Sequence, residues 1–322
     1  MSVLVYTENR DGKFRKPMFE LVSYASALAE MMKTTVTAIS IGQVEEGELK
    51  KLGTYGAGKV LTVSGDAYKT FDNQTYTALI AEVAASTGAV VVMLANNTSG
   101  KALSPRLSVR LKAGIASGVI GLPVSVEPFK IHKRVYSGSA LANVVVGTPV
   151  KVLTLMQNSF DLHEKGVNAV VESYSPKNVI PSKTVVLDVQ KLEGKVLLSE
   201  ASVVVSGGRG MKSADNWAPL TELAALLDGA TACSRPVSDE GWRPHDEHTG
   251  QTGKIIAPDL YIAVGISGAT QHLAGVSSSK YIVAINTDKT APIFEAAQYG
   301  IVGDASKVLP KLVEAVKQAK GK

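Results

Sequence analysis

The chain has 322 residues, of which 45% are hydrophobic and 20% charged, with a net charge of +5 and a pI near 9.0. This composition is ordinary for a globular protein, and the length is sufficient for two domains. The apolar runs are short and broken by Gly or Pro, which argues against an integral membrane protein. The basic residues are scattered, apart from a Lys-rich C-terminal helix, and lack interleaved aromatic residues, which argues against nucleic-acid binding.

The N-terminal sequence, MSVLVY, is typical of a first strand rather than of a signal peptide or transit segment. The one cysteine, Cys233, allows no intrachain disulfide and fits a reducing compartment. We therefore expect a bacterial cytoplasmic location, with a processed mitochondrial matrix protein as the alternative.

The first half of the chain alternates between β-branched segments and segments with helical spacing. The predicted strands are 3–6, 35–41, 60–63 and 90–94, and the predicted helices are 19–32, 45–52, 75–85 and 105–112. This βαβα order predicts a parallel sheet with helices on both faces.

The pattern changes from about Val119. Three strand-like segments, 131–137, 141–146 and 150–156, follow one another without a helix. They predict an antiparallel edge on the parallel sheet. The Pro-containing polar segment 174–181 then approaches a domain boundary, which we place near Lys195. It divides the chain into 1–194 and 195–322, and the segment 180–195 could act as a hinge.

The second half restarts the alternation, with predicted strands at 201–205, 230–233, 261–264, 281–285 and 299–302 and helices at 217–227 and 309–319. The predicted fold class is α/β with two domains, each a mainly parallel sheet with flanking helices. The C-terminal domain is predicted to be doubly wound.

Three of these strands end in small or polar residues. They run into GISGA at 265–269, into NTD at 286–288 and into Gly303-Asp304. In an open parallel sheet, ligands bind beyond the carboxyl ends of the strands. The pattern therefore predicts a site for an extended nucleotide cofactor.

The GISGA segment is the strongest local signal. Its backbone amides and the Ser267 hydroxyl could bind a pyrophosphate where the following helix begins. His272, one turn into that helix, could face the same ligand, although a lone histidine is more often structural.

Three further segments have both a functional and a plain interpretation. SGGRG at 206–210 lets the backbone approach a ligand, but it is not GxGxxG and could be an ordinary turn. In Ser234-Arg235-Pro236, the proline favours an extended Arg235, whose guanidinium could stabilise negative charge or simply lie on the surface. GQTGK at 250–254 lacks the spacing of a phosphate-binding P-loop, yet it offers the Thr252 hydroxyl.

Other chemistries find little support. A histidine pair with carboxylates at 245–248 invites a metal site, but it lies in a Gly/Pro-rich segment without a third cluster of ligands. Cys233 lacks a matched His/Asn arrangement, so a buried thiol is favoured over a nucleophile. We expect no metal and no hydrolase site.

Together these segments resemble the α subunit of electron transfer flavoprotein. The resemblance is dense from 203 to 313 and rests on SGGRG, Ser234-Arg235, GQTGK, residues 261–275 and APIF at 291–294. The spacing between the segments also fits, and the first half resembles the family's N-terminal domain with weaker motifs. Thr270 in place of an apolar residue and Met211 in place of leucine are mild departures.

The resemblance implies an FAD site in the second domain. Around the flavin ring it implies Arg235 over the ring, Thr252 at N5 and His272 near O2, with Ser234, Gln251 and Gln271 beside them. Along the rest of the cofactor it implies Ser267 at the phosphates, within the turn that holds Gly265 and Gly268. It places Asn286 and Asp304 at the adenosine end, and Arg209 near the flavin and a subunit interface.

The resemblance also implies a function. The chain would pair with a β subunit, with one FAD per dimer and AMP or a second FAD in the β subunit. It would be an electron carrier rather than an enzyme. It would take single electrons from flavoprotein dehydrogenases, such as the acyl-CoA dehydrogenases of fatty acid β-oxidation, to a membrane quinone oxidoreductase. A cation at Arg235 and a donor at His272 would stabilise negative charge on the reduced ring.

Two alternatives remain at this point. The chain could belong to an electron-bifurcating relative that uses NADH, since the residues that decide this lie mostly in the β subunit. It could also be a non-redox scaffold that binds an adenine nucleotide, although such a protein has no specific need for Arg235, Thr252 and His272 together.

Overall fold

A computed structural model describes residues 1–138, 140–189 and 196–321. The chain divides into two compact units, the first made of residues 1–135 and 139–190 and the second of residues 191–322 together with Tyr136–Gly138. The boundary expected near Lys195 falls outside the described residues. No helix within the described residues is long and apolar enough to cross a membrane.

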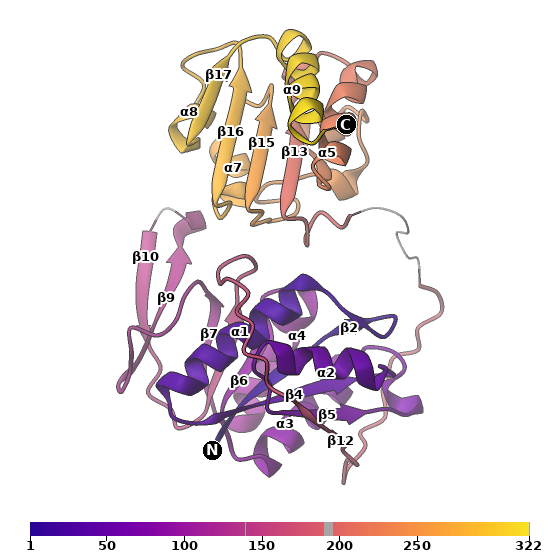
Figure 1. The fold of residues 1–322 in the computed structure, drawn as a ribbon, viewed down its shortest axis with the longest axis vertical. Helices are drawn as coiled ribbons and strands as arrows, with labels where there is room; N and C mark the ends of the chain where they lie inside the picture. The colour runs from indigo at the N-terminus through magenta and orange to yellow at the C-terminus, as the bar shows by residue number, and fades with distance from the viewer. Residues whose placement is uncertain (139, 190–195, 322) are drawn as a thin grey trace. The chain divides into compact units, whose positions relative to one another are not determined.

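The first unit is built on a mixed sheet whose strand order is β10-β9-β7-β11-β6-β1-β4-β5-β12, with β8 paired to β9 (Figure 1). In chain order its strands and helices are β1 (Ser2–Thr7), β2 (Asn9–Arg10), β3 (Lys13–Phe14), α1 (Lys16–Met31), β4 (Thr35–Ile41), α2 (Glu46–Thr54), β5 (Lys59–Val63), α3 (Asn73–Ser86), β6 (Ala89–Ala95), α4 (Thr98–Leu111), β7 (Gly114–Val119), β8 (Ser125–Val126), β9 (Phe129–Val135), β10 (Ala140–Val145), β11 (Lys151–Leu155) and β12 (Val170–Ser173). The 3-10 turn η1 (Asp66–Tyr68) also belongs to this unit, whereas the 3-10 turn η2 (Tyr136–Gly138) is grouped with the second unit.

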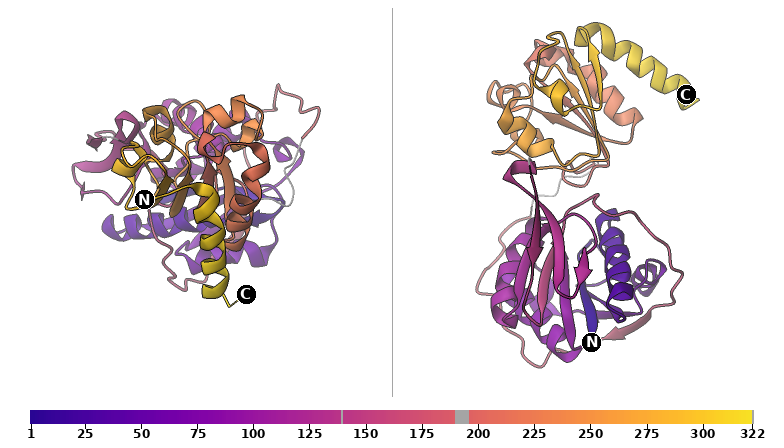
Figure 2. Two further views of the ribbon diagram at one scale, coloured as in Figure 1. Left: turned by 90° about the horizontal axis from the view of Figure 1, so that it is seen from above. Right: turned by 90° about the vertical axis from the view of Figure 1, so that its left-hand side faces the viewer.

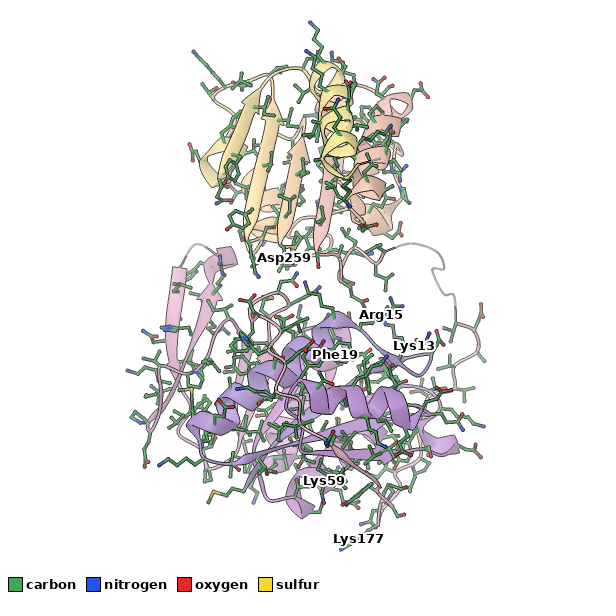
Figure 3. All side chains as sticks on the ribbon, viewed as in Figure 1. Lys13, Arg15, Phe19, Lys59, Lys177 and Asp259 are labelled. Atoms are coloured by element: carbon green, nitrogen blue, oxygen red, sulfur yellow. The ribbon has the colours of Figure 1, made fainter. Side chains whose placement is uncertain are left out.

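The central parallel strands of this sheet are buried on both faces, as is usual for parallel strands. Along β1, Val3 and Val5 pack on the side of α1 and α2, while Leu4 and Tyr6 pack on the side of α3 and α4. Phe19 of α1, labelled in Figure 3, lies over Tyr55 with ring centroids 4.9 Å apart. The predicted arrangement, a mainly parallel sheet with helices on both faces, is therefore confirmed for this unit.

The predicted antiparallel edge is confirmed for β9 and β10, but it is wrong for the segment 150–156. That segment forms β11, which lies between β6 and β7 and runs parallel to both. The physical reason is its pattern of burial. Four of its five residues, Val152 to Leu155, are buried, whereas β10 alternates between half-buried and exposed residues. A strand that is covered on both faces belongs in the middle of a sheet.

Five strands were not predicted: the two-residue strands β2, β3 and β8, and the longer strands β7 and β12. The glycines at 114 and 118 obscure the pattern of β7, and β12 is a mostly exposed edge strand. Lys59 of β5, labelled in Figure 3, pairs with Glu172 of β12 at 3.0 Å. Helix α4 begins seven residues before the predicted start, because the Asn97 side chain accepts a hydrogen bond from the amide of Gly100 and caps it.

A buried carboxylate fixes the segment that follows β11. Glu20 of α1 is 2% exposed, and its carboxylate accepts hydrogen bonds from the backbone amides of Asn158, Ser159 and Phe160 at 2.8–3.0 Å. Burial raises the pKa of Glu20, and the three amide hydrogen bonds oppose that shift. One side chain thus satisfies three consecutive donors that the fold takes out of water.

The second unit is built on a five-stranded parallel sheet in the order β14-β13-β15-β16-β17 (Figure 1). Its strands and helices in chain order are β13 (Val203–Gly207), α5 (Ala218–Leu226), β14 (Ala230–Cys233), α6 (Arg235–Asp239), β15 (Leu260–Val264), α7 (Thr270–Val276), β16 (Tyr281–Asn286), α8 (Ile293–Ala296), β17 (Tyr299–Val302) and α9 (Ala305–Ala319). Three 3-10 turns, η3 (Arg209–Met211), η4 (Ala214–Trp217) and η5 (His245–Glu247), lie among them.

Helices cover both faces of this sheet as well, as the turned views in Figure 2 show. Val204 and Ala263 pack on the side of α7 and α8, whereas Val205 and Val264 pack on the side of α5 and α9. The doubly wound arrangement predicted for this half is therefore the one observed, and it brings all five carboxyl ends of the strands to one edge.

Candidate functional site

The strand order of the second unit identifies where a ligand can bind. The first strand of the unit, β13, lies between the second strand, β14, and the third, β15. The chain therefore adds β14 on one side of β13 and the remaining strands on the other side. In parallel α/β sheets, ligands occupy the crevice at this switch point, beyond the carboxyl ends of the strands. The twelve residues predicted to bind the cofactor all follow or end these strands.

The segments after β13 and β15 touch each other at the switch point. The amide of Gly210 donates to the carbonyl of Gly265 at 3.0 Å, and a Cβ built on Gly210 would lie 2.6 Å from the Cα of Gly265. Gly265 itself has φ +62°, which is left-handed. Glycines are required here because two backbones are in direct contact, so the predicted close approach at SGGRG is first of all an approach to GISGA.

The GQTGK segment is attached to α7. The amide of Gln251 donates to the carbonyl of Gln271 at 2.7 Å, and a Cβ built on Gly275 would lie 2.5 Å from the Cα of Gly250. Gln251, Thr252 and Gln271 are exposed. The fold therefore brings two segments that are 20 residues apart in the sequence to one surface, with their amide and hydroxyl groups accessible to a ligand.

The Ser234–Arg235 pair follows β14 and lies next to the same segment. Ser234 is buried, and its amide donates to the carbonyl of Gly207 at 3.0 Å. The amide of Thr249 donates to the carbonyl of Cys233, which fixes the start of GQTGK beside β14. The Arg235 side chain is 63% exposed and lies 3.3 Å from the carboxylate of Asp239.

The extended conformation expected for Arg235 is wrong, because Arg235 is the first residue of helix α6. Ser234 takes the extended position before the helix, with φ −76° and ψ 159°, and Pro236 falls in the first turn. Proline is tolerated there since the first amides of a helix have no partner within it. The guanidinium therefore extends from the start of a short helix.

His272 is buried rather than open to the crevice. It is 7% exposed, and its Nε2 lies 2.8 Å from the hydroxyl of Tyr261. Burial lowers the pKa of His272 to about 4, with His248 adding to the shift and the nearby Thr249 carbonyl opposing it. The imidazole is therefore neutral at pH 7.

The depressed pKa of His272 predicts a loss of stability in acid. The unfolded chain takes up a proton near pH 6.5, whereas the folded chain resists protonation down to about pH 4. Stability from this group is therefore full above pH 6.5 and declines as the pH falls toward 4, by about 3 kcal/mol in total. We expect His272→Gln to remove that part of the decline. Denaturant unfolding of both proteins at pH 7 and pH 4.5 measures it, and parallel declines would contradict the assignment.

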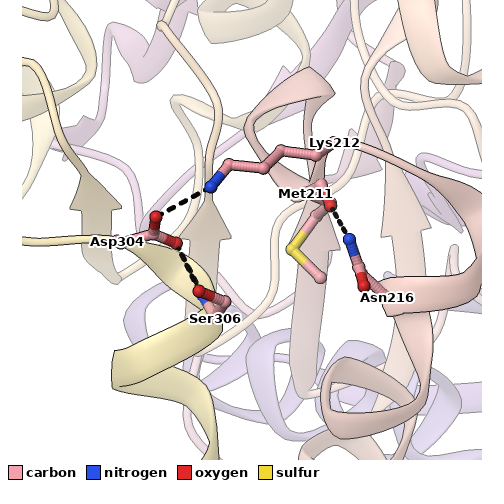
Figure 4. Close-up of polar contacts among 5 residues, drawn as sticks. All are labelled: Met211, Lys212, Asn216, Asp304 and Ser306. Atoms are coloured by element: carbon pink, nitrogen blue, oxygen red, sulfur yellow. Dashed lines mark hydrogen bonds and ion pairs between the residues drawn. The ribbon is translucent and has the colours of Figure 1, made fainter.

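The last two predicted residues lie at the ends of β16 and β17. The side-chain amide of Asn286 donates to the carbonyl of Ile266 at 2.8 Å, so it ties the end of β16 to the GISGA segment. Asp304 caps α9, with Oδ1 accepting from the amide and hydroxyl of Ser306 at 2.9 and 2.8 Å. Its Oδ2 accepts from Nζ of Lys212 at 2.8 Å (Figure 4).

Sequence reasoning did not single out Lys212, and no local signal could have done so, because its partner lies 92 residues away. Next to this pair is a cavity of about 270 Å³, lined by residues of the η3–η4 segment, α5 and the first turns of α9. Lys212 and Asp304 are two of its polar lining residues, together with Asp215, Asn216 and Ser306.

The histidine pair that suggested a metal is not part of a metal site within the described ranges. The rings of His245 and His248 lie 5.5 Å apart, but no group of three or more potential ligands forms there. Glu247 of the same segment instead accepts two hydrogen bonds from Arg243, at 2.8 and 2.6 Å. Burial raises the pKa of the Cys233 thiol to about 12, so this thiol is not a ready nucleophile.

Comparison with known proteins finds two family models that match this chain. Residues 197–277 match the model of the electron transfer flavoprotein FAD-binding domain, and residues 3–179 match that of the electron transfer flavoprotein domain. The electron transfer flavoprotein subunit alpha of Bacillus subtilis is 38% identical over 319 residues, covering 98% of this chain and 97% of its own. That of Pseudomonas aeruginosa is 38% identical over 318 residues, covering 98% and 100%.

A protein called FixB from Clostridium saccharobutylicum is 34% identical over 322 residues, covering 98% of this chain and 96% of its own. Among solved structures, a putative thiamin diphosphate-dependent enzyme from Mycobacterium smegmatis aligns with 96% of this chain at 11% identity and a TM-score of 0.25, a likeness too small to use. The two matched domains and the full-length relatives show that this chain belongs to the electron transfer flavoprotein α-subunit family and contains the family's FAD-binding domain.

Proposed function

We propose that this chain is the FAD-binding subunit of an αβ electron carrier. It would receive single electrons from flavoprotein dehydrogenases, such as acyl-CoA dehydrogenases, and pass them to a membrane quinone oxidoreductase. One FAD would bind to the second unit, the β subunit would hold AMP or a second FAD, and the pair would work in the cytoplasm. The carrying observation is that exposed polar groups from separate strand ends share one edge of the FAD-binding domain.

The residues at this edge fit a flavin nucleotide. The guanidinium of Arg235, the Thr252 hydroxyl and the side-chain amides of Gln251 and Gln271 are donors suited to ring nitrogens and carbonyls. The contact between Gly210 and Gly265 leaves no side chain between the segments that follow β13 and β15 at this point. Bound FAD would supply the one-electron chemistry, while the protein supplies binding, charge and exclusion of water.

Each predicted residue then has a proposed place. Arg235 and Ser234 would lie at the ring with Thr252, Gln251 and Gln271. Ser267, in the turn with Gly265 and Gly268, would bind the pyrophosphate. Asn286 and Asp304 would bind the adenosine, and Arg209, which is exposed, would lie near the ring and the β subunit. The Nε2 of His272 bonds to Tyr261, so its proposed contact with the ring would use Nδ1, which is buried in this structure.

Replacing Arg235 tests the proposed electrostatics. A guanidinium near the ring stabilises the negative charge that reduction adds. We expect Arg235→Ala to lower the potential of the first one-electron step by about 60 mV, equivalent to a tenfold change in the equilibrium constant for one electron. Arg235→Lys keeps the charge and should lower it less. Spectroelectrochemical titration measures both, and an unchanged potential in Arg235→Ala would show that the side chain does not act on the ring.

Co-expression with the β subunit tests the function itself. A yellow complex that a flavoprotein dehydrogenase reduces and a quinone oxidoreductase reoxidises would support the carrier. A second FAD together with reduction by NADH would point to a bifurcating relative. A colourless complex that binds only an adenine nucleotide would reject the redox function and favour a nucleotide-binding scaffold.

A further inference from the structure

Lys212 has a backbone conformation that is unusual for a lysine. It has φ +71° and ψ −33°, and the amide of the next residue, Ser213, donates to the carbonyl of Met211 at 2.9 Å. A tight three-residue turn of this kind is strained, and residues other than glycine rarely occupy its central position. Such an outlier at a strand end suggests that the lysine side chain has a role.

The turn around Lys212 is held in place on both sides. On one side Gly210 bonds to Gly265 across the switch point. On the other, the side-chain amide of Asn216 donates to the carbonyl of Met211 at 2.8 Å (Figure 4). The Lys212 side chain therefore starts from a fixed point and reaches Asp304, at the end of a strand three positions away in the sheet.

The pair contributes little to stability. The Lys212 side chain is 66% exposed and that of Asp304 28% exposed, and ion pairs in such surroundings stabilise a fold only slightly. Since the strained turn opposes folding, stability does not explain why a lysine is present. The effect of the ammonium on Asp304 is the better explanation.

Lys212 leaves Asp304 oriented and able to accept one more donor. Oδ1 already accepts from the amide and hydroxyl of Ser306, and Oδ2 accepts from Lys212. An ionised carboxylate has about four acceptor positions, so one remains on Oδ2 for a ribose hydroxyl. The ammonium also neutralises a carboxylate that would otherwise repel the two negative charges of a pyrophosphate nearby.

We propose that Lys212 is a positioning residue for the adenosine half of the cofactor, acting through Asp304, which it orients and whose charge it balances. The proposal rests on the proposed FAD site and extends it to a residue without a direct role at the ligand. A lysine that acts through Asp304 differs from one that binds phosphate directly. The effect of replacing Lys212 on FAD binding must then disappear when residue 304 carries no charge.

A double-mutant cycle on the full chain, co-expressed with its β subunit, tests this. Affinities for FAD and for FMN, which lacks the adenosine, are measured by flavin fluorescence in wild type, Lys212→Met, Asp304→Asn and the double variant. Asparagine keeps the helix cap at 304 without the charge. Lys307→Met removes one exposed positive charge from the same helix turn as a control, and Lys212→Arg should restore the function.

We expect Lys212→Met to weaken FAD binding about tenfold, with less loss at high salt, where repulsion is screened. FMN affinity should be unchanged, and Lys307→Met should change FAD affinity by less than about twofold. In the Asp304→Asn background, Lys212→Met should also cost less than about twofold.

An equal loss in both backgrounds would overturn the proposal and make Lys212 a direct ligand of the cofactor, and no loss in either would also overturn it. If Lys212→Met fails to fold, Lys212→Gly removes the ammonium and relieves the strained turn, and the same cycle applies. A wild-type complex that binds no FAD would instead reject the proposed function on which the inference depends.

Discussion

Gly265→Ala is expected to destabilise the second unit by about 3 kcal/mol or more and to abolish retention of FAD. The new Cβ would lie 2.7 Å from the Cα and 2.8 Å from the carbonyl carbon of Gly210, which are backbone atoms that cannot rotate away. The φ of +62° adds strain for any side chain. The segments after β13 and β15 would separate at the switch point. Denaturant unfolding gives the stability, and absorbance of the purified complex gives the FAD content.

Gly241→Ala is the matched control for this prediction. Gly241 has φ +72° in the same unit, and nothing lies within 4 Å of a Cβ built there. Gly241→Ala is therefore expected to destabilise the unit only by the backbone strain, about 1 kcal/mol. Equal losses of stability from the two substitutions would show that the close contact between Gly265 and Gly210 does not require glycine.

Glu20→Ala is expected to destabilise the first unit by about 4 kcal/mol, since it leaves one buried and two partly buried backbone amides without their acceptor. The carboxylate of Glu20 is the partner of Asn158, Ser159 and Phe160, at 2.8–3.0 Å. Glu20→Gln keeps one acceptor oxygen but turns an NH₂ group toward a donor, so an intermediate loss is expected. Urea unfolding followed by circular dichroism measures the three proteins.

Glu30→Ala provides the comparison on the same helix. Its carboxylate is 62% exposed and pairs with Lys165 at 2.8 Å, a contact worth about 0.5 kcal/mol. A loss from Glu20→Ala no larger than this would mean that water replaces the carboxylate at the three amides.

The α/β class and the layers of both units were predictable, because buried β-branched runs and Ala-rich helices have distinct periods. The placement of the candidate residues near the carboxyl ends of strands was predictable for the same reason, since it depends only on where strands end. The position of β11 was not predictable, because it depends on which strands pair with this buried segment. That pairing involves residues far apart in the sequence. The preference of a residue before proline for extended backbone does not hold at Arg235, because Arg235 begins helix α6 and Ser234 is the extended residue before it.

At the candidate site, the contacts between residues distant in the sequence were the features that could not be predicted. Tyr261 and His272 are 11 residues apart, yet their pairing depends on how α7 packs on β15. Lys212 and Asp304 meet only once the sheet has formed. A histidine in a helix after a glycine turn has the same local pattern whether it faces a ligand or the core.

The position of β11 has a consequence for the order in which the first unit forms. Strand β6 ends at Ala95 and β7 at Val119, yet the strand that joins them is not complete until Leu155. As the chain leaves the ribosome, the inner edges of β6 and β7 therefore wait for a segment made later, and the wide loop between them must close at an entropic cost. Until then two apolar strands present open backbone edges to other chains, which makes this interval the period of greatest risk of aggregation during synthesis.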